Sequence, residues 1–150
     1  FHEIEETLNT SAEIDIVRET ISTLKFIKSK NLKLGIVSTK RKEVVLQLAC
    51  EYQMDSFFDV LVGGEDVIHY KPHPEPIFHA CEKLCIKPSE ILFVGDSLLD
   101  LKSAKSAGAI FVGVLTGVCD ATELKNAKAD YIFSHVGELV RLLNLENVSK

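Results

Sequence analysis

Strand-like and helix-like segments alternate from residue 11 to the end of this 150-residue sequence. Short aliphatic runs bounded by polar residues or glycine are typical of strands buried on both faces. We expect these strands at residues 33–38, 59–62, 91–95, 109–114 and 130–133. Helical spacing of apolar residues predicts helices at 11–30, 41–52, 74–84, 99–107, 120–127 and 136–143. Such alternation requires crossover connections, so it predicts an α/β fold, a three-layer Rossmann-like core with a mostly parallel sheet.

Composition narrows the classes of partner. A hydrophobic fraction of 46% and a charged fraction of 26% are typical of a globular chain that buries a core. The formal charge of -5 lacks the basic footprint of nucleic-acid binding, so we expect no nucleic-acid partner. Since no run approaches about 18 apolar residues, we also expect no membrane contact and a cytoplasmic protein.

The residues that follow each strand are the candidates for chemistry, because ligands of open parallel sheets bind at the carboxyl ends of the strands. The first predicted strand leads into Ser38, Thr39 and Lys40, just before a predicted helix. Hydroxyl groups and unpaired amides at a helix N-terminus can bind an anion, so these residues are candidate phosphate ligands. The alternative is an ordinary helix cap with exposed basic residues.

The strand at 91–95 is followed by two carboxylates, Asp96 and Asp100. Two carboxylates held close together favour a hard divalent cation with oxygen ligands, so the pair predicts a Mg²⁺ site. The alternative is that Asp96 or Ser97 caps the next helix and Asp100 only favours its first turn; the two interpretations are compatible.

A third loop with candidate functional residues contains Lys71, which precedes a cluster of prolines. Proline restricts the preceding residue, so the loop holds its lysine in place, where the ammonium can balance a phosphate or carboxylate. The alternative is a solvated lysine in a rigid turn. His69, His73 and His79 lie nearby, but no partner spacing supports a metal site there.

Taken in order, these features resemble the haloacid dehalogenase-like (HAD) phosphotransferase superfamily. Ser38, Lys71, Asp96 and Asp100 match its second, third and fourth motifs. The residues that surround these motifs look most like those of the phosphoglycolate phosphatase and pyrophosphatase branch. The resemblance implies a hydrolase that uses Mg²⁺ on Asp96 and Asp100, with Ser38 and Lys71 as catalytic contacts to a small phosphomonoester such as phosphoglycolate. Ser38, Thr39, Lys40 and Lys71 are then its phosphate ligands.

One departure from the family is serious, because its first motif, Asp-x-Asp-x-Thr, holds the aspartate nucleophile and no Asp-x-Asp occurs here. The resemblance implies that residues 1–10 are the remnant of a helical cap, and that 11–150 are a core domain without its first strand. We expect the nucleophile, which forms the aspartyl-phosphate, to lie upstream in the parent protein. This chain alone is expected to be inactive. We expect either that another segment of the same protein fills the gap, or that the chain folds poorly or pairs with a second copy.

Three other classes of protein are alternatives to a phosphatase. A domain without a nucleophile can serve binding, regulation or assembly instead of catalysis, and the upstream sequence discriminates it. A phospho-accepting receiver places its acidic pair before its lysine, the reverse of the order here. Dinucleotide binding needs a Gly-x-Gly-x-x-Gly turn, whereas Gly63 and Gly64 fit a simple tight turn.

Overall fold

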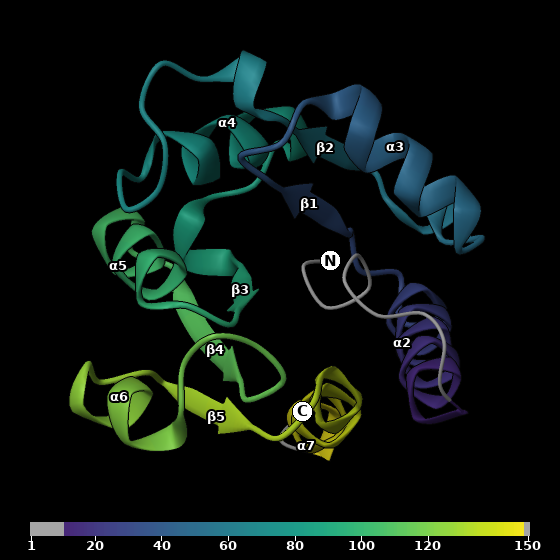
Figure 1. The fold of residues 1–150 in the computed structure, drawn as a ribbon. Coiled ribbons are helices and arrows are strands. Elements are labelled where there is room, and N and C mark those ends of the chain that lie inside the picture. The colour runs from purple at the N-terminus through teal and green to yellow at the C-terminus, as the bar shows by residue number, and fades with distance from the viewer. Residues whose placement is uncertain (1–10, 149–150) are drawn as a thin grey trace.

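The computed structural model describes residues 11–148, which fold into alternating helices and parallel strands (Figure 1). The strands are β1 (Gly35–Val37), β2 (Val60–Val62), β3 (Leu92–Gly95), β4 (Ile110–Val114) and β5 (Tyr131–Phe133). The α-helices are α2 (Ser11–Ser29), α3 (Lys42–Glu51), α4 (Glu75–Leu84), α5 (Leu98–Ala107), α6 (Ala121–Asn126) and α7 (Leu139–Val148). Short 3₁₀ turns are η1 (Asp55–Phe57), η2 (Gly64–Asp66), η3 (Pro88–Glu90) and η4 (Val136–Glu138).

The predicted α/β alternation is confirmed, with shorter strands than expected. The run at 33–38 forms only the three residues of β1, and the segment predicted as a helix from 136 begins with η4 before α7. The cap remnant expected at residues 1–10 lies outside the described residues. No helix among residues 11–148 is both long and apolar enough to cross a membrane.

The strands are parallel, as predicted, but within the described residues they form two sheets. β1 pairs with β2, and β3, β4 and β5 form a second sheet in that order. Figure 1 shows β1 and β3 apart, with no other described strand between them. Each of these two strands therefore has one side without a strand partner in this part of the chain.

Burial along the strands follows from this pairing. Phe111 and Val112 of β4, the central strand of its sheet, are fully buried, and Phe111 packs in the core cluster beneath α4 and α5. Val94 of β3 is 36% exposed. The prediction that every strand is buried on both faces is therefore right for most of β4 and wrong for β3.

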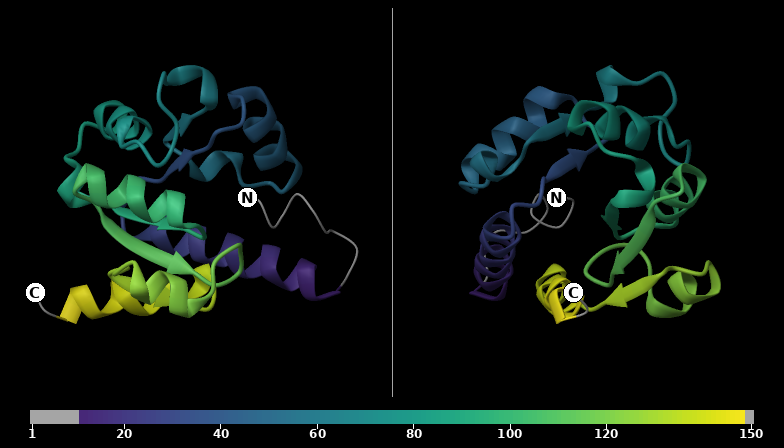
Figure 2. Two further views of the ribbon diagram at one scale, coloured as in Figure 1. Left: turned by 60° about the vertical axis from the view of Figure 1, so that its left-hand side comes forward. Right: turned by 180° about the vertical axis from the view of Figure 1, so that it is seen from behind.

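Helices pack in a layer on each side of the strands. α4, α5 and α6 lie along one side, while α2 and α7 contact each other on the other side (Figures 1 and 2). The core beneath the first layer is built from small and large apolar side chains: Ile77, Cys81, Leu101, Ala104, Ala109, Phe111, Cys119 and Leu124. Since α4 contacts β1, β2 and α5, it ties the two sheets together on this side.

Candidate functional site

The loop after β1 places the predicted hydroxyl at a strand end. Ser38 extends the pairing with β2, because its amide donates to the carbonyl of Val62 at 2.9 Å. Its Oγ accepts a hydrogen bond from the amide of Lys40 at 3.1 Å. The Lys40 amide is thus already engaged, while the Ser38 hydroxyl proton can still be donated to a ligand.

The first backbone amide of α3 is already hydrogen-bonded, so it is not available to bind an anion. The amide of Lys42 donates to both carboxylate oxygens of Glu65, at 3.0 and 3.1 Å, and its Nζ lies 2.8 Å from Asp66 Oδ1. Burial alone raises the pKa of Asp66, but hydrogen bonds from Lys42 and from the Gly63 amide lower it below its usual range. The carboxylate of Glu65 therefore occupies the anion position at this helix N-terminus. The N-cap is Arg41 and makes no side-chain cap bond, so the alternative of an ordinary Ser or Thr cap is wrong.

The glycine pair after β2 makes this packing fit. A side chain on Gly64 would place its Cβ 2.4 Å from the carbonyl oxygen of Thr39, and the Gly64 amide donates to the carbonyl of Lys40 at 2.8 Å. A Cβ on Gly63 would lie 2.7 Å from the backbone nitrogen of Lys42. The pair is therefore a turn, as predicted, and it also supports the backbone of the Ser38 loop.

The acidic pair lies at the end of β3, where α5 begins. Ser97 caps this helix by accepting from the amide of Asp100 at 3.2 Å, and its hydroxyl donates to Asp100 Oδ2 at 2.9 Å. The amide of Asp96 donates to the same oxygen at 3.3 Å. A Cβ on Gly95 would lie 2.5 Å from that of Asp100, so glycine lets the Asp100 side chain fold over the strand end. The capping interpretation is confirmed for Ser97, and Asp100 does more than favour a first turn.

The predicted lysine meets the predicted acidic pair. Lys71 Nζ lies 2.5 Å from Asp100 Oδ1, and their side chains are 17% and 8% exposed. A solvated lysine in a rigid turn is therefore the wrong alternative. The contact also changes the electrostatic argument for the pair, because Lys71 already balances the charge of Asp100. Within residues 11–148 the carboxylate of Asp96 has no such partner, so it is the stronger candidate cation ligand.

Two sets of contacts that position this site were not predicted from the sequence. Residues 115–119 follow β4 and pack on Asp96, since a Cβ on Gly117 would lie 1.9 Å from Asp96 Oδ2 and the Cys119 amide donates to the Asp96 carbonyl at 3.1 Å. The sequence could have indicated this contact, because parallel pairing brings the end of β4 to the same sheet edge as the end of β3.

The second set of contacts fixes the Lys71 loop. Glu75 accepts from the amides of Ile68 and His69 at 2.8 and 3.0 Å, and it lies 2.7 Å from His69 Nδ1. The Ile68 amide, followed by the His69 ring, lowers the pKa of Glu75 below its usual range. On the other side, the buried Ser103 hydroxyl donates to the carbonyl of His73 at 2.8 Å. Proline was the predicted cause of rigidity, and these hydrogen bonds add to it.

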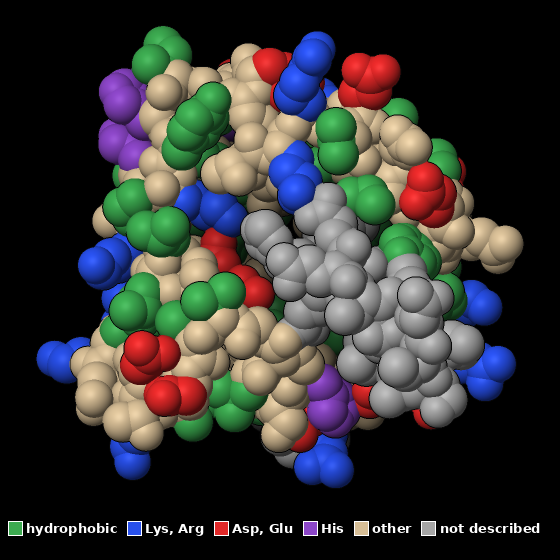
Figure 3. Space-filling view, in the orientation of Figure 1, with side chains coloured by type: hydrophobic (Ala, Val, Ile, Leu, Met, Phe, Trp, Pro, Cys, Tyr) green, Lys and Arg blue, Asp and Glu red, His purple; other side chains and the backbone are tan. Residues whose placement is uncertain are grey.

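The predicted residues fall into two clusters. Lys71, Asp96 and Asp100 form one at the end of β3, whereas Ser38 and its neighbours lie at the end of β1, in the other sheet. On the face in Figure 3, basic and acidic side chains lie side by side near the middle of the molecule. Both clusters follow the carboxyl ends of parallel strands.

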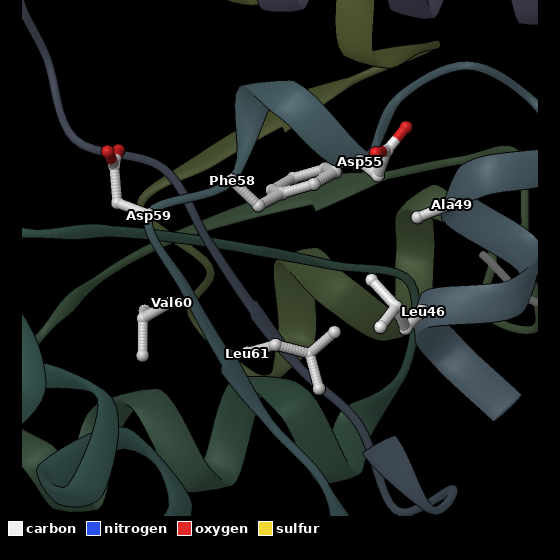
Figure 4. Close-up of a pocket in the computed structure, with 7 residues that line it drawn as sticks. All are labelled: Leu46, Ala49, Asp55, Phe58, Asp59, Val60 and Leu61. Atoms are coloured by element: carbon white, nitrogen blue, oxygen red, sulfur yellow. The ribbon is translucent and has the colours of Figure 1, made fainter. Parts of the chain in front are cut away.

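A pocket in another part of the structure is lined by none of the predicted site residues. It lies between α3, β2 and the turn that joins them (Figure 4), and it is lined by Leu46, Ala49, Asp55, Phe58, Asp59, Val60 and Leu61. Its carboxylate at Asp59 is already bound by Lys28 Nζ at 2.7 Å and by the Leu34 amide at 2.8 Å. Packing and structural ion pairing explain this surface.

These observations define a Rossmann-like α/β domain with a lysine–carboxylate cluster at the carboxyl end of a parallel strand. The chain belongs to the haloacid dehalogenase-like hydrolase family, whose sequence model matches residues 1–114.

Relatives and solved structures agree on this family. Phosphoglycolate phosphatase of Escherichia coli (strain K12) is 35% identical over 123 residues, which are 82% of this chain and 49% of that protein. Pyrophosphatase PpaX of Bacillus mycoides is 37% identical over 135 residues, 90% of this chain and 61% of that protein. The crystal structure of a predicted phosphoglycolate phosphatase from Haemophilus somnus superposes with a TM-score of 0.78 at 30% identity, and covers 83% of this chain and 56% of that one. The chain thus spans about half to three fifths of the length of these proteins.

Proposed function

We propose that the intact protein containing this chain is a Mg²⁺-dependent phosphatase that hydrolyses a small phosphomonoester such as phosphoglycolate. The observation that carries the proposal is the contact between Lys71 and Asp100 beside the carboxylate of Asp96, which no lysine or arginine among the described residues neutralises. Family membership and the names of the relatives support phosphate ester chemistry. The proposed partner is therefore a small phosphorylated metabolite.

The donor set fits Mg²⁺ through Asp96 first. A hard cation prefers carboxylate oxygens, and within the described residues the Asp96 carboxylate is not neutralised by a lysine or arginine. Asp100 is held by Lys71 and Ser97, so we assign it a supporting role, directly or through water. Bound there, the cation would offset repulsion between a phosphate dianion and an attacking carboxylate.

Lys71 and Ser38 are the proposed contacts to the phosphoryl group. An ammonium has three donors, so Lys71 can hold Asp100 with one and a phosphoryl oxygen with another. The Ser38 hydroxyl accepts from Lys40 and can donate its own proton to phosphate. Thr39 and the Lys40 side chain are further proposed ligands. Such contacts act most strongly on the charge that develops in the transition state.

The nucleophile is proposed to lie on another segment of the same polypeptide. Its carboxylate would attack phosphorus and the ester oxygen would leave as an alcohol; water would then hydrolyse the acyl phosphate to free phosphate and carboxylate. The sequence has no Asp-x-Asp, and it spans about half to three fifths of the relatives' length. One strand between β1 and β3 would bring such a residue between the two clusters.

A second candidate is a catalytically incomplete HAD-like domain with a binding, regulatory or assembly role. The missing Asp-x-Asp is the specific observation in its favour. The residues encoded upstream of Phe1 discriminate the two candidates, because a phosphatase needs an aspartate motif there that can form a buried strand.

The direct test is a phosphatase assay on the intact protein with phosphoglycolate, pyrophosphate and an aryl phosphate, with and without Mg²⁺. We expect turnover that requires Mg²⁺ and is lost in Asp96→Asn. Turnover unchanged by a chelator, or by this substitution, would refute the proposed site. Folded protein that binds Mg²⁺ and phosphate without turning over any of the three substrates would favour the second candidate.

A further inference from the structure

Two histidines and a glutamate gather on the outside of the Lys71 loop. One ligand atom from each of His69, His73 and Glu75 lies within 4.8 Å of the others. The two imidazole rings stack with centroids 4.6 Å apart at an interplanar angle of 25°. No partner spacing in the sequence supports a metal site at these histidines, but the turn into α4 brings the carboxylate of Glu75 close to them.

The hydrogen bonds prepare His69 as a ligand. Glu75 Oε2 lies 2.7 Å from His69 Nδ1, and the same carboxylate accepts hydrogen bonds from the amides of Ile68 and His69. A metal ion that takes the place of the Nδ1 proton would be bound by His69 Nδ1 and Glu75 Oε2 together, so this contact already holds two ligand atoms side by side.

His73 is held from the opposite direction. Its Nδ1 accepts from the Glu75 amide at 3.0 Å, and its carbonyl is bound by Ser103. Binding a metal through His73 would replace the first of these bonds, whereas the Ser103 bond keeps the backbone in place. Replacing the hydrogen bond from the Glu75 amide costs little free energy, because both rings are exposed.

We propose that His69, His73 and Glu75 form a binding site for a divalent transition metal, with Zn²⁺ as the probe. Imidazole and carboxylate together suit Zn²⁺, whereas Mg²⁺ favours an all-oxygen set such as Asp96 and Asp100. Tetrahedral Zn²⁺ with bonds of about 2.1 Å would bring its ligand atoms to about 3.4 Å apart. Rotation of the exposed rings closes the observed spread, and water completes the coordination.

This site is separate from the proposed Mg²⁺ site, although Lys71 connects the two. His69 precedes that lysine by two residues and His73 follows it by two. The metal-site proposal does not depend on phosphatase activity, so its primary test is a measurement of binding alone.

The experiment titrates Zn²⁺ into the intact protein against a chromophoric chelator, with millimolar Mg²⁺ present to saturate oxygen sites. We expect one Zn²⁺ per chain and an affinity at least about tenfold weaker in His69→Ala and in His73→Ala. His79→Ala is the matched control, since this histidine lies in α4 outside the cluster. Co²⁺ in place of Zn²⁺ should give a visible d–d spectrum that the same two substitutions remove.

Two results would overturn the proposal. One is the absence of Zn²⁺ binding by the folded protein at about 100 μM, an affinity too weak for a three-ligand site. The other is Zn²⁺ binding that survives both histidine substitutions but is lost in Asp96→Asn, which would place the ion at the acidic pair instead.

Discussion

Replacing Gly117 by alanine tests how the loop after β4 positions Asp96. The added Cβ would lie 1.9 Å from Asp96 Oδ2 and 2.4 Å from both Asp96 Cβ and Cγ. Rotation about the first side-chain torsion can move the carboxylate, but it cannot move Cβ, which the backbone of β3 holds. Because carbon atoms pack at about 3.5 Å, the two backbone segments must separate by about 1 Å.

The magnitude follows from that displacement. Forcing an extra carbon into packed structure typically costs about 1–3 kcal/mol of unfolding free energy. Displacing a positioned group by about 1 Å can lower the rate about a hundredfold. We therefore expect Gly117→Ala to lower kcat/KM of the intact enzyme about a hundredfold and to weaken Mg²⁺ binding, while the protein still folds.

Calorimetric Mg²⁺ titration, steady-state kinetics and thermal unfolding of the intact protein are the assays. Gly137→Ala is the matched control, because the three atoms nearest its Cβ all belong to the side chain of Glu19, the closest at 2.4 Å. That side chain is exposed and can turn aside with the loss of its contact to His135. Near-normal Mg²⁺ affinity and kcat/KM in Gly117→Ala would refute the reasoning, since the contact on Asp96 would then not set the position of its carboxylate.

Three further predictions concern single contacts. Asp96→Asn should weaken Mg²⁺ binding measured by calorimetry, and unchanged affinity would remove Asp96 from the cation site. Lys71→Ala should lower kcat/KM on an aryl phosphate by roughly a hundredfold, or about 3 kcal/mol; near-normal turnover would exclude Lys71. Because it also leaves Asp100 buried without its cation, chemical denaturation should show a stability loss that Asp100→Asn partly restores in the double variant. Since the folded state lowers the pKa of Glu75, its hold on the Lys71 loop is present above the usual glutamate pKa and is lost as pH falls through the lowered value. The Ile68 and His69 amide resonances should titrate with a midpoint below the usual glutamate range, and a midpoint within it would contradict this.

The elements and the strand-end residues could be predicted from sequence because their signals are local. Apolar spacing predicts each helix and strand, and a parallel sheet brings their carboxyl ends to one edge. The sequence favoured a phosphate or carboxylate partner for Lys71 but did not identify Asp100, which lies 29 positions away along the chain. The ends of the strands were less predictable, because pairing and tertiary packing decide them.

The remaining contacts join residues whose proximity no local pattern encodes. Glu65 binds the first amide of α3 because the turn after β2 passes beside that helix. Gly117 lies on Asp96 through pairing of β3 with β4, and Glu75 reaches the Lys71 loop through the turn into α4. In each case the sequence shows a plausible turn or helix start, and only the fold shows which side chain lies opposite.

The division of the strands into two sheets connects structure to activity. Neighbouring strands lie about 4.8 Å apart, so one strand inserted between β1 and β3 would hold the Ser38 and Asp96 clusters about 10 Å apart, facing one phosphate. Without it, each cluster keeps its own contacts, but no strand pairing in the described residues fixes their separation. We therefore predict no Mg²⁺-dependent phosphatase turnover by a polypeptide of Phe1 to Lys150 alone. Its unpaired strand sides should show either rapid amide exchange or protection that depends on protein concentration through self-association. Robust turnover by a preparation whose mass matches only these residues would refute this, and would mean that the nucleophile lies within this sequence.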